Sequence, residues 1–474
     1  MNIQMISTRD ADKNSNTYTD VLLAGLAPDG GLYVPSEYPK FSVEELVDLK
    51  DRTYQEVAFA VKKKLVDGAI PDEDLRDLIN KAYTADSFIG TEDGNVVPLQ
   101  EIEKDFYMQN LSLGPTAAFK DMALQQLGQE MNYELEKRDE ELTILGATSG
   151  DTGSAAEAAF KGLERVKLFM LSPEIGMSEF QKAQMGSLTG DNIFNISIRG
   201  RFDDCQDLVK QLKSEEEFAK LGAVNSINWG RISSQVPYFF SGYLQAVENI
   251  GDEVDFVVPT GNFGNVLSGY IAKMMGLPIR HLVVATNEND VMDKLFKTGV
   301  YTLTKSEITS SPSMDISKAS NYERLVFDVL KQDGQKVADY MSEFVDKGSV
   351  DLSDYGVSVD DLEALGFASF SSTHADRLAT IKRVYDTAGF VIDTHTADAV
   401  HVGWQHKSTA GDVPVICMGT ALPVKFEASI EEALGFIPDR PERFVGLEDT
   451  MQENAFHTID IDAEHLRDYI RGNK

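Results

Sequence analysis

The sequence of 474 residues contains only two cysteines, Cys205 and Cys417, which lie far apart and in no C-x-x-C pair. This scarcity argues against a disulfide framework and a cysteine zinc site. The seven histidines show no metal-ligand spacing, and His401 and His406 are expected on the surface or in the core. No run of about 18 apolar residues and no signal peptide occurs. We therefore expect a cytoplasmic protein without a metal or a membrane segment.

Basic residues are also scarce. The chain has 44 lysines and arginines against 77 aspartates and glutamates, which gives a formal net charge of -33. Because such a surface repels nucleic-acid phosphates and anionic lipid headgroups, neither nucleic acids nor membranes are expected partners. The same field disfavours small anionic ligands, so any phosphate site must be built locally from loop amides, helix N-termini and a few cations.

What the sequence does contain is a repeated order of apolar strand, glycine turn and helix. The clearest units span 141–160 and 254–276, and further strands are expected from about 166, 193, 281 and 413. This order predicts an α/β protein whose parallel sheets are covered by helices and whose ligands bind beyond the carboxyl ends of the strands. A helical pattern over 42–82 indicates a separate N-terminal unit.

Lys120 lies at the start of an expected helix, after the apolar stretch LSLGPTAAF. An exposed lysine is the ordinary expectation at such a place. A desolvated ammonium, however, has a lowered pKa and becomes an amine nucleophile toward an aldehyde. Lys120 is therefore a candidate for covalent attachment of an aldehyde cofactor.

Two loops that follow strands could hold anions. The amides of GNFGN at 261–265 would converge at a helix N-terminus and could hold a phosphate. The TSGDTG loop at 148–153 could hold a carboxylate, although its Ser, Thr and Asp residues are also ordinary helix caps. A nicotinamide site fits less well because the G-x-G-x-x-G spacing is absent. A reactive lysine and two anion cradles together suit an aldehyde-phosphate cofactor and an amino-acid substrate.

In this order, GPTAAFKD with Lys120 and the SGDTG and GNFGN loops resemble the fold-type-II pyridoxal-phosphate enzymes, and specifically the longer threonine synthases. Agreement continues over essentially the whole chain, in GLAPDGGLYVP, NSINWGR, SPSMDISKASNYERL, DTHTAD and GTALPVKF. The resemblance implies two parallel-sheet α/β domains that flank a cofactor cleft, and a mostly helical N-terminal domain. The implied boundaries are 1–95 for the N-terminal domain, 96–134 with 235–474 for the large domain, and 135–234 for the small domain.

The resemblance also implies roles for the site residues. Lys120 would bond to the cofactor aldehyde and then move protons, and Thr420 would face the pyridine nitrogen. The cofactor phosphate would be held by Gly261, Asn262, Phe263, Gly264 and Asn265. The substrate carboxylate and the cofactor ring oxygen would be contacted by Thr148, Ser149, Asp151 and Thr152. The substrate phosphate would be held by Asn225, Ser226 and Arg231, of which Arg231 can bind it bidentately.

Three positions depart from the pattern of this family. Leu422 stands where the family often has histidine, and Thr394 stands where it often has proline. Asp151 stands where relatives with other reactions often have asparagine, which makes its contact to the ring oxygen less certain. None of the three changes Lys120 or the phosphate loop.

The implied reaction converts O-phosphohomoserine and water into L-threonine and phosphate. A serine or threonine dehydratase and a phospholyase that yields a keto acid remain alternatives with the same cofactor. The SPSMDI segment and the N-terminal domain argue against a dehydratase. A third alternative is a non-catalytic protein that binds a phosphate ligand, and the intact motif around Lys120 argues against it. The sequence does not separate a monomer from a homodimer.

Overall fold

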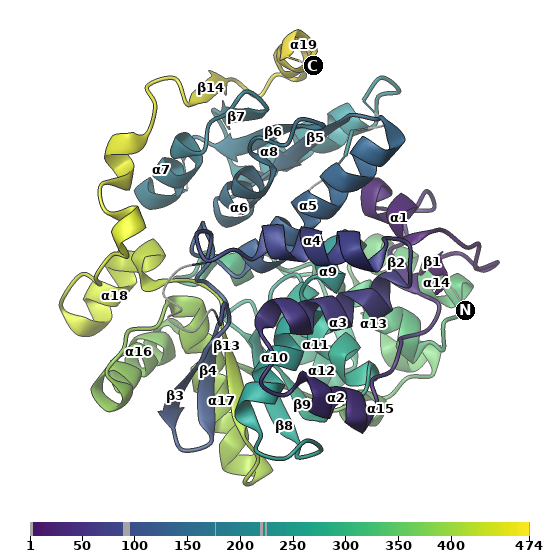
Figure 1. Cartoon of the computed structure of the whole chain (residues 1–474), viewed down its shortest axis with the longest axis vertical. Coiled ribbons are helices and arrows are strands. Elements are labelled where there is room, and N and C mark those ends of the chain that lie inside the picture. Colours follow the sequence, from purple (N-terminus) through teal and green to yellow (C-terminus); the bar gives the residue numbers. More distant parts are fainter. Residues whose placement is uncertain (1–2, 89–94, 176, 219–220, 223–224, 474) are drawn as a thin grey trace.

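The computed structural model describes residues 3–88, 95–175, 177–218, 221–222 and 225–473. A six-stranded sheet occupies the lower half of Figure 1 and a four-stranded sheet the upper half, while the N-terminal helices lie against the front of the lower half. This arrangement matches the predicted α/β architecture with parallel sheets.

The larger sheet has the strand order β12-β9-β8-β13-β4-β3. Every neighbouring pair is parallel except β3 and β4, which form an antiparallel hairpin at the edge. The central strands are buried throughout, as expected of apolar runs with helices on both faces. The strands are β12 (Phe367–Ser371), β9 (Ile279–Thr286), β8 (Val254–Pro259), β13 (Val415–Gly419), β4 (Phe106–Asn110) and β3 (Leu99–Glu103).

The smaller sheet has the order β14-β7-β6-β5, and all of its pairs are parallel. Its strands are β14 (Phe456–Ile459), β7 (Ile193–Ile198), β6 (Val166–Pro173) and β5 (Leu142–Ala147). β14 comes from the C-terminal segment, which runs up one side of the molecule in Figure 1 and ends in α19 (Ala463–Asn473). Leu466 and Ile470 of α19 pack into the core of this half with Leu208.

This placement differs from the predicted range 235–474 for the large domain. The structure attaches β14 and α19 to the smaller sheet instead. Little in the sequence indicates this placement, because β14 is a four-residue edge strand with only part of its surface buried. A strand this short carries no readable alternation.

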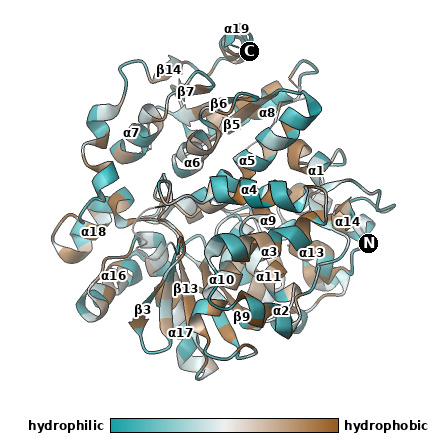
Figure 2. Cartoon of the chain, in the orientation of Figure 1, coloured by the Kyte–Doolittle hydropathy of each residue, from teal (hydrophilic) through white to brown (hydrophobic). Residues whose placement is uncertain are grey.

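Over residues 42–82, where the sequence indicated a helical pattern, the structure contains three helices. α2 and α3 each begin with a capping box, in which Ser42 pairs with Glu45 and Thr53 pairs with Glu56. Figure 2 shows α4 as mostly hydrophilic, and its apolar side chains face inward. The elements are β1 (Met5–Ser7), α1 (Tyr18–Ala24), β2 (Tyr33–Pro35), α2 (Val43–Leu49), α3 (Tyr54–Val66) and α4 (Asp72–Ala82), with β1 and β2 paired antiparallel.

The remaining helices connect or cover the sheets, and none in the described part of the chain is long and apolar enough to cross a membrane. They are α5 (Lys120–Arg138), α6 (Asp151–Phe160), α7 (Glu179–Ser187), α8 (Phe202–Lys213), α9 (Trp229–Ser233), α10 (Val236–Ala246), α11 (Gly264–Met274), α12 (Val291–Thr298), α13 (Tyr322–Val329), α14 (Gly334–Lys347), α15 (Val359–Ala364), α16 (His374–Ala388), α17 (Thr394–Ala410) and α18 (Glu427–Leu434). The short strands β10 (Val300–Thr302) and β11 (Ser349–Asp351) pair antiparallel. Single 3-10 turns are η1 (Pro312–Met314), η2 (Leu352–Tyr355), η3 (Pro423–Phe426), η4 (Glu442–Phe444) and η5 (Leu447–Thr450).

Candidate active site

The predicted site residues gather beyond the carboxyl ends of strands from both sheets. Lys120 is the first residue of α5, and the amide of Phe119 donates to the carbonyl oxygen of Thr420 at 2.9 Å. Ala118 and Ala421 pair as an isolated antiparallel bridge. The segment before the lysine is therefore tied to the end of β13, which places Lys120 and Thr420 side by side.

The Lys120 side chain points inward, with an exposed fraction of 12%. Its Nζ lies 3.4 Å from Oδ2 of Asp151, the first residue of α6. Burial lowers the pKa of Lys120, the cations Lys425 and Arg231 lower it further, and only Asp151 opposes them. The expected desolvation of this lysine is confirmed.

Asp151 is the charge centre of the site. Its Oδ1 accepts hydrogen bonds from Lys425 Nζ at 2.8 Å and Gln181 Nε2 at 3.0 Å. Its Oδ2 faces Lys120 and accepts from Ser313 Oγ at 3.3 Å. Burial alone would raise the pKa of Asp151, but Lys425 and Lys120 outweigh burial and hold this pKa well below its ordinary value. Asp151 is therefore an ionised acceptor, which cannot itself donate to a substrate carboxylate.

The TSGDTG loop caps α6. Thr148 Oγ1 accepts from the amides of Gly150 at 3.0 Å and Gly153 at 2.8 Å. Thr148 is buried, Thr152 is half-buried and Ser149 is exposed. The capping interpretation thus holds for Thr148, whose hydroxyl hydrogen is still free to donate. Substrate contacts by these residues remain a prediction.

The GNFGN loop lies between β8 and α11, as predicted. Phe263 adopts a left-handed backbone with φ 64° and buries its ring against Phe296 and Tyr322, which fixes the turn into the helix. A Cβ at Gly261 would lie 2.9 Å from the carbonyl oxygen of Ser313, so glycine is required for this close approach. Since Ser313 also contacts Asp151, the loop is linked to Lys120 through two side chains.

The three residues expected to hold the substrate phosphate do not behave alike. Asn225 Oδ1 accepts from the amides of Ile227 and Asn228 and so forms a turn. Ser226 Oγ lies 2.7 Å from Ser320 Oγ, which in turn donates to Asn262 Oδ1 at 3.1 Å. This chain of hydrogen bonds connects Ser226 to the predicted cofactor loop.

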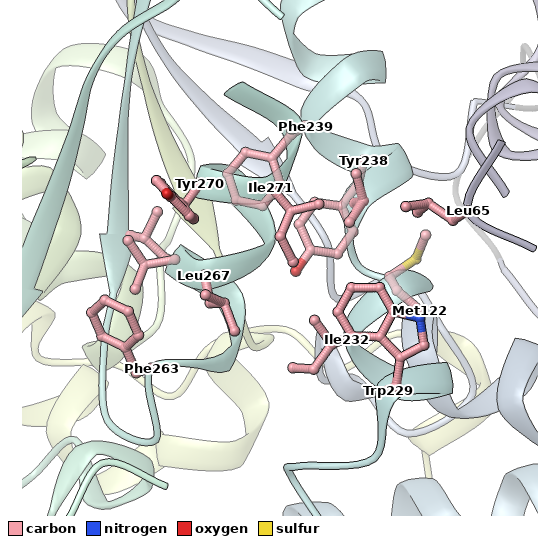
Figure 3. Packing of buried hydrophobic residues seen from close by; sticks show 14 of the residues in the cluster. Leu65, Met122, Trp229, Ile232, Tyr238, Phe239, Phe263, Leu267, Tyr270 and Ile271 are labelled. Carbon is pink, nitrogen blue, oxygen red and sulfur yellow. The ribbon is translucent and has the colours of Figure 1, made fainter. Parts of the chain in front are cut away.

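Arg231 is the most informative of the three, because it is a buried cation without an acidic partner among the described contacts. Its side chain is 5% exposed, its Nη1 has no hydrogen-bond partner, and burial lowers its pKa to about 10. Figure 3 shows its neighbours Trp229 and Ile232 packed between Met122 and α11, which holds α9 in place. A buried guanidinium with an unused donor indicates an anion site.

The sequence interpretation assigned no role to several residues that complete the site. Asp393 caps α17 and accepts from Thr396 Oγ1, which accepts from the amide of Thr420. Asp393 Oδ1 also accepts from His395 Nδ1 at 3.0 Å, while His395 Nε2 accepts from the amide of Ser313. Because Nε2 accepts a hydrogen bond, His395 is the neutral Nδ1–H tautomer. The DTHTAD segment thus positions both Thr420 and Ser313.

Lys425 is another site residue to which the sequence interpretation assigned no role, and its side chain is fully buried. It lines a pocket together with Ser178 and Phe180 on one side and Thr309 and Pro312 on the other. The sequence did contain a signal for Lys425, namely a charged residue between the apolar Val424 and Phe426. A lysine in such a setting is rarely buried without a partner, so this position could have indicated a buried ion pair.

Comparisons with known proteins agree along the whole chain. Residues 4–83 match the family described as threonine synthase N terminus, residues 95–378 match pyridoxal-phosphate dependent enzyme, and residues 396–470 match threonine synthase, C-terminal. The chain belongs to the threonine synthase family. Its cofactor is accordingly pyridoxal phosphate, and the resemblance inferred from the sequence is confirmed.

Individual members of the threonine synthase family are similar over nearly their full length. Threonine synthase of Methylobacillus glycogenes is 48% identical over 480 residues, covering 99% of both chains. The enzyme of Corynebacterium glutamicum is 47% identical, covering 98% of this chain and 97% of its own. The crystal structure of PLP-bound threonine synthase from Brucella melitensis has a TM-score of 0.92 at 38% identity and covers 99% of both chains. The fold is therefore the fold-type-II architecture, and the chain is a pyridoxal-phosphate-dependent lyase.

The residues present fit this cofactor. The first amides of α11 have no partner within the helix, and they follow a glycine turn as a phosphate site requires. Asn265 Nδ2 is buried without a partner, while its Oδ1 accepts from Tyr238 at 2.8 Å. A buried amine, an unsatisfied amide and a free helix N-terminus thus meet in one place.

Two departures from the family pattern have simple structural explanations. Thr394 occupies the first position of α17, where proline is also well accommodated because this amide needs no partner within the helix. Leu422 packs with Ala117, Phe180 and Val424 in a small apolar cluster. Neither position contacts Asp151 or Lys120 among the described interactions.

Proposed function

We propose that this chain makes L-threonine and inorganic phosphate from O-phosphohomoserine and water, with Lys120 as the catalytic amine. The observation that carries the proposal is that a desolvated lysine lies near a buried arginine, Arg231, whose Nη1 has no hydrogen-bond partner among the described residues. Arg231 is close enough to lower the pKa of Lys120. The amine can react with an aldehyde, and the arginine can bind a second anion. Overall, the Cγ–O bond to phosphate breaks and the oxygen of water is added at Cβ.

Three groups would hold the cofactor. The 261–265 loop and the N-terminus of α11 would bind its phosphate, Lys120 Nζ would bond to its aldehyde carbon, and Thr420 would face its ring nitrogen. When bound, pyridoxal phosphate supplies an electron sink for the substrate carbons. Because a hydroxyl cannot balance a protonated pyridine as a carboxylate would, Thr420 favours a neutral ring nitrogen.

Lys120 also moves protons. A neutral amine at Nζ can accept a proton from a neighbouring substrate carbon and later return it. Asp151 lies 3.4 Å away and stabilises the ammonium that forms in between. The position at the start of α5, locked by Thr420, keeps the amine close to the reacting atoms.

Arg231 binds the substrate phosphate and holds it near the reacting carbons. A planar guanidinium can make two parallel hydrogen bonds to phosphate, and burial strengthens them. Ser226 adds a hydroxyl from the same segment, while Thr148, Ser149 and Thr152 bind the substrate carboxylate. The local cations thereby overcome the unfavourable net charge of -33.

The experiment that tests this function follows phosphate and threonine together during incubation with O-phosphohomoserine. We expect equal amounts of the two products. Release of phosphate with 2-oxobutanoate and ammonia in place of threonine would instead identify the keto-acid phospholyase. A cytoplasmic location is not needed for this reaction and remains a prediction.

The matched variants are Lys120→Ala and Lys382→Ala, because Lys382 is an exposed lysine paired only with Asp386. Loss of a proton-transferring amine costs at least about 10²–10⁴-fold in kcat. Lys120→Ala should therefore show that loss and no visible absorption from a lysine-bound cofactor, while Lys382→Ala behaves as wild type. A Lys120→Ala protein with wild-type turnover would refute the proposal.

A further inference from the structure

The two oxygens of Asp151 are used unequally. Oδ1 is bound by Lys425 Nζ at 2.8 Å, whereas Oδ2 faces Lys120 Nζ at the longer distance of 3.4 Å. Gln181 reinforces the first side and Ser313 the second. The shorter ion pair of this carboxylate is therefore with the lysine to which no role was assigned.

Lys425 has no alternative position for its charge. Its side chain is fully buried, and Asp151 is its only hydrogen-bond and ion-pair partner in the described part of the chain. A buried ammonium is costly unless it is paired. Lys425 and Asp151 therefore form a lasting pair, while Lys120 must leave Asp151 each time its amine reacts.

We propose that Lys425 is a positioning residue that binds the Asp151 carboxylate so that the Lys120 amine is free to lose its proton. This inference rests on the proposed role of Lys120. Without Lys425, Asp151 would have Lys120 as its only cationic partner and would hold the proton on that amine. A protonated amine cannot attack an aldehyde or accept a proton.

Each charged group around Lys120 fits this assignment. Asp151 on α6 favours the ammonium, and Lys425 beyond β13 and Arg231 on α9 oppose it. Asp121, next along α5, binds Thr116 through both carboxylate oxygens, and burial raises its pKa. Of these two cations, only Lys425 contacts Asp151 among the described residues, and Asp151 is the carboxylate that stabilises the proton on Lys120.

The test measures the protonation of Lys120 directly in the cofactor-free protein. Acetic anhydride acylates only neutral amines, so the labelling rate of Lys120, read by mass spectrometry as a function of pH, gives its midpoint. In Lys425→Met we expect this midpoint to rise by at least about one pH unit. The variant removes a like charge and leaves the Asp151 carboxylate to act on Lys120 alone, and an opposite charge within a few ångströms shifts a pKa by about 1–3 units. Exposed Lys382 is the internal reference and should not move.

Lys425→Arg is the conservative variant, because it keeps a cation beside Asp151. We expect a wild-type midpoint for Lys120 in this protein. In the holoenzyme, the acid limb of the pH profile of kcat/KM should move upward with Lys425→Met and stay in place with Lys425→Arg. A readout based on pH separates positioning from a merely structural role, which would lower stability without moving either midpoint.

An unchanged Lys120 midpoint in folded Lys425→Met would overturn the inference. Should Lys425→Met not fold, a Lys425→Arg protein with a raised midpoint would overturn it equally, since the charge is retained. The labelling needs no substrate, so its outcome is independent of whether the wild type makes threonine. Failure of the proposed function and failure of this inference can thus be told apart.

Discussion

Two buried aspartates lie at opposite ends of strands, Asp151 among lysines and Asp255 beside an arginine and two histidines. Asp151 follows the carboxyl end of β5, and its partners are Lys120 and Lys425. Asp255 lies near the beginning of β8, at the edge away from the glycine loop, and its partners are Arg280 and His406. The chemistry of the partners differs. An arginine stays charged at all ordinary pH values, whereas a buried lysine can lose its proton.

Both oxygens of the Asp255 carboxylate accept hydrogen bonds from neighbouring groups. Oδ1 accepts from Arg280 Nε at 3.0 Å and the amide of His281 at 2.9 Å, and Oδ2 accepts from His406 Nε2 at 2.8 Å. Asp255, His281 and His406 lie close enough together to hold a metal ion, a proximity that their spacing in the sequence did not predict. Arg280 already binds both oxygens, however, which opposes a second cation there.

The difference between the clusters teaches where this fold keeps unused binding capacity. Near the carboxyl ends of the strands, Arg231 Nη1 and Asn265 Nδ2 have no hydrogen-bond partner among the described residues. Both Asp255 oxygens, by contrast, accept hydrogen bonds from arginine and histidine. Unsatisfied buried donors lower stability unless a ligand binds them. We therefore assign the Asp151 cluster to function and the Asp255 cluster to stability.

The largest expected effect comes from exchanging one aspartate at a time for asparagine. Asp255→Asn should lower the free energy of unfolding by about 3 kcal/mol, because it leaves Arg280 and the neighbouring imidazoles without their counter-ion. Activity per folded molecule should stay as in wild type. Asp151→Asn should lose about 100-fold in kcat, and it should also lower stability, because it leaves the buried ammonium of Lys425 without its carboxylate.

Urea unfolding and turnover numbers corrected for the folded fraction measure the two effects. The comparison would fail if Asp255→Asn lowered turnover as much as Asp151→Asn did.

Much of the candidate active site could be predicted from the sequence, because local patterns encode it. The Lys120 helix start and the 261–265 turn are each encoded within about ten consecutive residues, by glycine placement and an apolar strand. Lys425, Ser313 and His395 could not be assigned in this way. Their roles come from the contacts of Lys425 and Ser313 with Asp151 and of His395 with Ser313, which span long stretches of chain and which no local pattern records.

The Asp255 cluster was harder to predict for the same reason. Its members come from β8, β9 and α17, and their proximity follows from strand order and helix packing. His406 was expected on the surface or in the core, and its 3% exposure places it in the core, yet its partner was not foreseen. The short strand β14 likewise joined the smaller sheet without a local signal.

Acid should weaken the Asp255 cluster in a defined direction. Burial opposes ionisation of Asp255, but hydrogen bonds from His281, His406 and Arg280 outweigh burial and hold its pKa well below the ordinary value. A carboxyl with a depressed folded pKa stabilises the fold above its unfolded pKa of about 3.9, and this contribution is lost as the pH falls below that value.

The expected loss is up to about 1.4 kcal/mol for each pH unit below about 4, present in wild type and absent in Asp255→Asn. Urea unfolding of both proteins between pH 5 and the lowest pH at which they fold would measure it. Asp328, whose pKa burial raises to about 6, titrates in both proteins and cancels in the difference. Parallel curves for the two proteins would contradict this account of Asp255.

The smallest expected effect concerns the hydrogen bond from His406 to Asp255. His406→Phe removes one donor from Asp255 and should cost about 1 kcal/mol of the free energy of unfolding, since Arg280 remains. His401→Gln is the control, because this half-exposed histidine contacts Gln405 on the surface and its replacement should change stability by less than about 0.5 kcal/mol. Urea unfolding of wild type and both variants at one pH would measure the two costs. A His406→Phe protein as stable as wild type would mean that Arg280 and the amide of His281 hold the Asp255 carboxylate without the imidazole.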